Sequence, residues 1–165
     1  MQQALRTELC DEGNIELKAT LSQVWIKKLT VPYDQALLTN LKETLWEVLA
    51  YYHKKNRALE EAITLMDAAQ IANYCESFAE ALKYINRAIG IFEPAEVPEL
   101  LAQAHYRRAL LLYIWAKNGN PQFFQGALDS FKETVKVFSR DYAPEVLRMF
   151  NNIWELFTLK CPMKN

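Results

Sequence analysis

The chain has 165 residues, 51% of them hydrophobic, with a net charge of −1 and a pI near 6.2. This length suits one domain with a real core, and the apolar content argues against disorder. A nearly neutral chain without a long basic run offers nucleic acid no electrostatic attraction. No apolar run has the length of a membrane span, and the first residues lack the basic start of a secretory signal. We therefore expect no nucleic-acid binding, no membrane span and no secretion.

Residues that could carry chemistry are sparse. The three cysteines stand far apart without a CxxC pair, which favours reduced thiols in a cytoplasmic protein over disulfides or a zinc site. Neither His53 nor His105 follows an acidic residue by three positions, so the Glu-x-x-His pairs of a di-iron bundle are missing. Nucleotide-binding and hydrolase motifs are also missing. We expect a protein that is not an enzyme, with no catalytic residues, no metal and no cofactor.

The elements predicted along the chain are all helices. Neither glycine nor proline occurs between Pro32 and Gly90, which favours long helices over strands. A polar segment at 11–14 predicts a break after a short helix or frayed arm, with Asn14 as an N-cap. Seven helices are then expected at about 15–29, 34–54, 57–74, 77–92, 98–117, 122–139 and 144–159. In the first of these, the large apolar residues lie mostly on one side: Leu17, Leu21, Val24, Trp25 and Ile26.

Two short patterns recur at a similar spacing. The pattern aromatic-x-x-Ala-Leu contains Ala36, Ala81 and Ala127, which lie 45 and 46 residues apart. A helix start with proline before glutamate occurs at 97–101 and again 46 residues later at 143–147. In the helix at 77–92, Ala81 and Ala88 share one face, where small side chains let a neighbouring helix approach closely. A period in this range predicts helical repeats.

Helix pairs with alanine at set positions resemble tetratricopeptide repeats. The central pair carries the likeness best, with large, small and proline positions at or next to the consensus at Leu65, Ala69, Ala81, Ala88 and Pro94. The third pair is similar, with Ala109 and Ala127 at small positions and a longer turn, and 141–153 resembles a longer bacterial variety. The resemblance implies an all-α stack of antiparallel helix pairs, a TPR-like α-solenoid of about seven helices in one domain. Its pairs would lie at 15–55, 57–92 and 98–139, with a terminal helix at 144–159. HEAT-like repeats, whose period is closer to 46, remain an alternative.

The resemblance also implies a function. Tetratricopeptide repeats bind a peptide or helix of a partner protein in a concave groove lined by the first helix of each pair. The groove positions fall on Gln70, Asn73, Tyr74, Gln103, Tyr106, Arg107, Tyr113, Ile114 and Asn152. Amides can bond a peptide backbone, and aromatic side chains bury area at low entropic cost. We expect a protein–protein interaction module, such as an adaptor, a chaperone-like holder or an assembly factor. Tyr106 and Tyr113 are equally consistent with half-buried packing residues.

Two other functions stay open. The helix at 144–159 is apolar around more than one stripe, whereas a terminal capping helix should have a polar outer face. This pattern favours a homo-oligomeric structural subunit that associates through that helix. The groove could instead serve a regulatory domain that senses a peptide or small molecule. The four tryptophans are spread along the chain and are predicted to pack between helices: Trp25, Trp46, Trp115 and Trp154.

Overall fold

The computed structural model describes residues 2–138, 148, 151, 152 and 155. Over residues 2–138 all regular structure is helical, and the chain contains no strand there. The elements are α1 (Gln2–Lys28), α2 (Gln35–Lys54), α3 (Ala58–Tyr74), α4 (Phe78–Phe92), α5 (Pro98–Lys117), a 3-10 turn η1 (Pro121–Phe123) and α6 (Phe124–Val137). The all-helical prediction is thus confirmed for this part of the chain. The helix expected at 144–159, with Trp154, lies outside the described residues except for four isolated positions.

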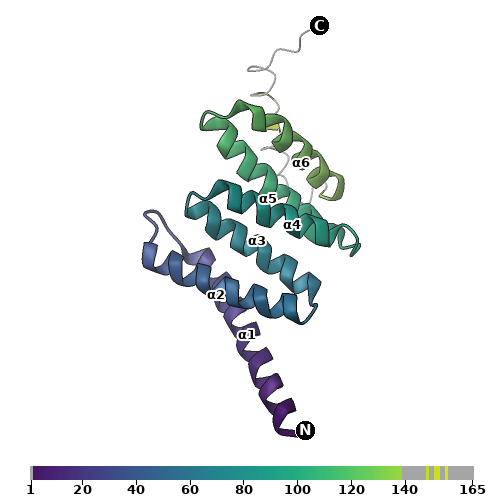
Figure 1. Cartoon of the computed structure of the whole chain (residues 1–165). Helices are drawn as coiled ribbons and strands as arrows, with labels where there is room; N and C mark the ends of the chain where they lie inside the picture. The colour runs from purple at the N-terminus through teal and green to yellow at the C-terminus, as the bar shows by residue number, and fades with distance from the viewer. Residues whose placement is uncertain (1, 139–147, 149–150, 153–154, 156–165) are drawn as a thin grey trace. The chain divides into compact units, whose positions relative to one another are not determined.

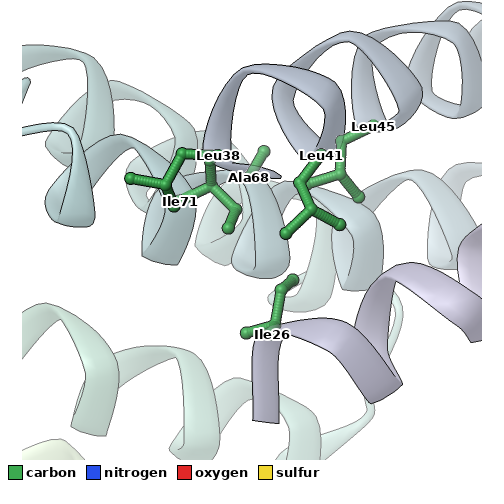
Figure 2. Packing of buried hydrophobic residues seen from close by; sticks show 6 residues of the cluster. All are labelled: Ile26, Leu38, Leu41, Leu45, Ala68 and Ile71. Atoms are coloured by element: carbon green, nitrogen blue, oxygen red, sulfur yellow. The ribbon is translucent and has the colours of Figure 1, made fainter. Parts of the chain in front are cut away.

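The chain divides into two compact units, Met1–Ile91 and Phe92–Asn165. In the first unit α2 packs against both α1 and α3, and α1 also touches α3. The centre of this unit is a cluster in which side chains from the three helices converge, shown in Figure 2. Its buried members are Ile26, Leu38, Leu41, Leu45, Ala68 and Ile71. A second cluster joins Ile15 of α1 to Val48 and Tyr52 of α2.

Helix α1 differs from its prediction. The expected break at 11–14 is wrong, because α1 runs without interruption from Gln2 to Lys28. Glycine and asparagine weaken a helix interior by roughly 0.5–1 kcal/mol each, but tertiary contacts can override this preference. Here Arg57 Nη1 lies 2.5 Å from Glu12 Oε1 and 3.5 Å from Glu16 Oε1, so one guanidinium holds both sides of the segment that contains Gly13. The N-terminal half of α1 projects away from α2 and α3 (Figure 1).

The turns after α2 and α3 have the same geometry. Asn56 and Glu76 have φ angles of 56° and 58°, in the left-handed region. At the first turn the Arg57 amide bonds the Tyr52 carbonyl and the Asn56 amide bonds the His53 carbonyl. The second turn has the equivalent bonds twenty residues later. These bonds form a Schellman motif, which ends a helix by satisfying its last carbonyls. Glycine usually occupies this position, and its absence here left the sequence without a clear turn signal.

In the second unit, α5 and α6 pack as an antiparallel pair joined by η1. Their shared cluster contains Ala109, Leu128 and Phe131, with Tyr106 and Tyr113 at its edge. The Thr134 hydroxyl is buried and donates to the Ala102 and Ser130 carbonyls at 3.3 and 3.0 Å. Ala109 of α5 and Ala127 of α6, the small positions of the predicted third pair, are both fully buried.

Candidate interaction surfaces

Three of the predicted groove residues lie together on α3. Gln70 Nε2 donates to Tyr74 Oη at 2.6 Å, and Asn73 lies half-buried beside them. The ring of Tyr33, from the α1–α2 connection, lies 4.5 Å from the ring of Tyr74 at an angle of 30°. The first unit therefore assembles a small surface of amide and phenol groups, in which Gln70 and Tyr74 are already bonded to each other.

The predicted residues of α5 belong to the second unit. Tyr106 packs edge-on against Phe131 at 5.9 Å, and Tyr113 packs against Phe124 at 6.3 Å. Both tyrosines are half-buried packing residues at the α5–α6 contact, which was the alternative interpretation of their spacing. Arg107 is also half-buried, whereas Gln103 and Ile114 are exposed. Asn152 is exposed and helical. Residues 149–150 and 153–154, on either side of it, lie outside the described residues.

The sequence interpretation noted an apolar side of α1 but did not foresee its exposure. Four side chains on α1 are strongly exposed, namely Leu17 (57%), Leu21 (47%), Val24 (42%) and Trp25 (47%). We call these four residues the α1 stripe. Their spacing of four, three and one residues places them within about 100° of one another around the helix. Among residues 11–28 of α1, the buried side chains are Ile15, Ser22 and Ile26, on the opposite face.

The predicted packing of the tryptophans is therefore partly wrong. Trp25 and Trp46 are 47% and 57% exposed, whereas Trp115 packs edge-on against Phe123 at 5.5 Å as expected. The physical reason for the exposure of Trp25 is that α1 carries apolar residues on two faces, and α2 and α3 can cover one of them. Apolar residues at both 15/26 and 17/21/24 were visible in the sequence and could have signalled a helix with two apolar faces.

Charged residues of opposite sign border the two ends of the α1 stripe. Asp11 and Glu16 lie toward its N-terminal end, and Lys27 and Lys28 lie at its C-terminal end. Lys28 Nζ lies 5.8 Å from the centre of the Trp25 ring, within range of a cation–π interaction. Lys18, on the other flank, is paired with Glu47 of α2 at 2.6 Å. The surface thus has an apolar centre with a charged rim, the usual composition of an interface.

A polar cleft of about 390 Å³ lies between α1 and α2 on one flank of the stripe. Its walls carry carboxylates, ammonium groups, an amide and a phenol, and its lining residues are Asp11, Asn14, Ile15, Glu47, Tyr51, Lys54 and Lys55. One of its carboxylates, that of Glu47, is already used by Lys18. The cleft is open and mixed in charge, so we regard it as part of the rim of the α1 surface.

Two ion-pair networks tie the first unit together. Arg57 Nη2 contacts Glu60 at 2.5 Å, and this hydrogen bond lowers the pKa of the Glu60 carboxyl. The guanidinium also lies over the Tyr52 ring at 5.5 Å, so Arg57 links α1, α2 and α3. In the second network, buried Glu61 of α3 pairs with Arg87 of α4 and lies 3.3 Å from His53 Nδ1. The charged groups of both networks are thus engaged in structural contacts within the first unit.

One titratable group in the second unit is buried without a partner. His105 is 9% exposed, and among the described residues its Nδ1 has no hydrogen-bond partner. Burial lowers the pKa of this imidazole, which favours its neutral form. A buried, neutral histidine among alanines is consistent with a packing residue.

The described residues offer no metal site and no membrane-spanning helix. Within the described ranges, no three His, Cys, Asp or Glu side chains gather as a metal site would require. None of the helices described here combines the length and apolar character needed to cross a bilayer. No protein-family model matches the chain, and neither a curated protein nor a solved structure is significantly similar to it.

Proposed function

We propose that this protein is a protein–protein interaction module, built from TPR-like helix pairs, that binds its partner through the α1 stripe. The observation that carries the proposal is the exposure of Leu17, Leu21, Val24 and Trp25 on one face of a helix whose other face is in the core. Exposed apolar residues scattered singly are ordinary, but a contiguous group with a polar rim marks an interaction site. Tryptophan is among the residues most enriched at the energetic centre of interfaces.

The helix-pair interpretation has its own support. Ala69, Ala81 and Ala88, the small positions of the central pair, are buried. The identical turns after α2 and α3 are consistent with a repeated unit. In this interpretation the protein acts as an adaptor, a chaperone-like holder or an assembly factor.

A second candidate surface is the predicted groove. The half-buried amides and phenol of Gln70, Asn73 and Tyr74 on α3 favour it, because such groups can bond an extended peptide. A peptide-binding role there would use α3 and leave the α1 stripe unused.

Retention of partners from a lysate of the source organism separates these surfaces. The tagged parent is compared with Leu21→Glu on the stripe, Asn73→Ala on α3 and Val137→Glu on α6. Val137 is the matched control, because its 41% exposure is close to the 47% of Leu21 and it belongs to neither surface. A partner that the parent retains, that Leu21→Glu loses and that Val137→Glu keeps supports the α1 surface. Loss with Asn73→Ala alone would favour the groove, and retention by every variant would contradict both.

A further inference from the structure

We infer, building on the proposed role of the α1 stripe, that its occupant is a second copy of this chain, bound antiparallel about a two-fold axis beside Leu21. A dimer of this kind uses the same patch on both copies, so the patch must be complementary to itself. The apolar residues and the charged residues of α1 are each arranged in a self-complementary way. Both arrangements are centred near position 21.

The apolar pattern is centred on Leu21. Leu17 and Trp25 lie four residues before and after it, on the same face of α1. A two-fold axis beside Leu21 therefore places Leu17 of each copy opposite Trp25 of the other. The smaller leucine then meets the larger indole at both ends, and the two Leu21 side chains meet at the axis. All three residues are 47–57% exposed in the single chain, so this contact would remove apolar surface from water.

The charge pattern has the same centre. Glu16 and Lys27 are eleven residues apart, about three helical turns, so they lie on one flank of the stripe. Their midpoint falls between positions 21 and 22, beside the apolar centre. Antiparallel pairing about this axis places Glu16 of each copy near Lys27 of the other, whereas parallel pairing would place like charges together. Antiparallel helix dipoles also oppose each other favourably.

The contact leaves the buried face of α1 unused. Ile15 and Ile26 hold α1 to the first unit through the face opposite the stripe, so pairing leaves the core intact. About an axis beside Leu21, the two helices overlap over residues 14–28 of each copy, so the contact is confined to the C-terminal half of α1. Four half-exposed side chains make a small interface, so we expect a concentration-dependent dimer and not an obligate one.

Sedimentation equilibrium of the full chain over a concentration series tests the inference. We expect the parent to pass from monomer to dimer. Leu21→Glu places two carboxylates at the axis and should remove dimerisation, whereas Val137→Glu on α6, which belongs to neither surface, should leave it unchanged. Glu16→Lys and Lys27→Glu each turn two attractive contacts into repulsive ones and should weaken the dimer by roughly tenfold or more.

A mixture of these two charge variants provides the sharpest result. In a heterodimer of Glu16→Lys with Lys27→Glu, every contact between positions 16 and 27 joins opposite charges again. The mixture should therefore associate about as strongly as the parent, although the Glu16–Arg57 contact stays lost in one partner. Circular dichroism confirms that each variant keeps the parent's helix content.

Three outcomes would overturn the inference: a parent that stays monomeric throughout, a dimer that survives Leu21→Glu, or a mixture that associates no better than its components. The parent could stay monomeric and still retain a lysate partner that Leu21→Glu loses. This result would overturn the inference that the occupant is a second copy and would leave the proposed function standing. A monomeric parent without such a partner would overturn both.

Discussion

Helix α3 buries ten of its 17 residues, including the charged Glu61 and Asp67. Helix α1 has 27 residues, and from Asp11 onward it buries Ile15, Ser22 and Ile26 while exposing four large apolar side chains. The two helices belong to one unit and touch each other. α3 has neighbours around it, whereas the neighbours of α1 cover one face. The contrast teaches that apolar residues show which faces of a helix can be buried. The number of neighbouring helices decides which of these faces are buried.

The largest expected effect comes from a matched pair of leucine truncations. Leu65 on α3 is fully buried, so Leu65→Ala should lower the free energy of unfolding by about 2–5 kcal/mol. Leu17 on α1 is 57% exposed, so Leu17→Ala should change it by no more than about 0.5 kcal/mol. Urea denaturation at a concentration where the chain is monomeric measures both. Similar losses for the two variants would mean that the α1 stripe is packed within the single chain.

Ion pairs extend the comparison to charged groups. Arg87→Ala leaves the buried Glu61 carboxylate without its main partner and should cost about 1–3 kcal/mol. Lys18→Ala removes the exposed pair between α1 and Glu47 and should cost about 0.2–1 kcal/mol. Adding Glu61→Gln to Arg87→Ala should recover part of the loss, because the uncompensated charge is then gone. If the double variant is no more stable than Arg87→Ala, burial of the Glu61 charge is not the cause.

The end of α3 allows a smaller, stabilising change. Glu76 adopts a φ of 58°, where a side chain is strained and glycine is not. Glu76→Gly should therefore raise the free energy of unfolding by up to about 1 kcal/mol, measured from thermal unfolding. Asn56→Gly, at the equivalent turn after α2, should gain less, since asparagine tolerates this conformation better. A lower melting temperature for Glu76→Gly would show that its side chain makes a contact worth more than the strain.

The smallest expected effect concerns the ion pair between Arg57 and Glu60 at the start of α3. The hydrogen bond from Arg57 lowers the pKa of Glu60 below its ordinary value of 4.5. A carboxyl with a lowered pKa stabilises the fold above its ordinary pKa, and this stabilisation is lost as the pH falls through the lowered value. The contribution of the Glu60 carboxylate to the free energy of unfolding, at most about 1 kcal/mol, should thus be lost in urea denaturation as the pH is lowered below 4.5. Glu60→Gln should flatten this part of the pH profile, and an unchanged profile would assign the acid sensitivity to other carboxyls.

The sequence predicted the helices of residues 34–138 well. Asp34 caps α2 by accepting from the Ala36 and Leu37 amides, and α5 begins at Pro98 and ends at Lys117 as expected. These boundaries depend on local signals, namely a capping carboxylate, a proline in the first turn and a polar Asn-Gly turn. Such signals act within one turn of the chain and need no tertiary information.

The candidate site was predictable in part. The i, i+4 spacing of Gln70 and Tyr74 puts them on one face, and the structure joins them by a hydrogen bond. The packing of Tyr106 and Tyr113 against α6 could not be distinguished from exposure on a groove, because periodicity identifies a face without identifying its neighbour. The α1 stripe was noticed as an apolar face, and its exposure was not foreseen.

By itself, the sequence determined an all-helical chain over 2–138, the positions of most helix ends and the small residues that allow close packing. The tertiary structure decided that α1 continues through Gly13, because Arg57 of a distant turn holds Glu12 and Glu16. It also decided which apolar face of α1 is buried. Ile15 and Ile26 meet Val48 and Leu41 of α2, whereas Leu17 and Leu21 lie on the opposite face. Helical period is a local property, but burial depends on neighbours that the chain brings from far away in the sequence.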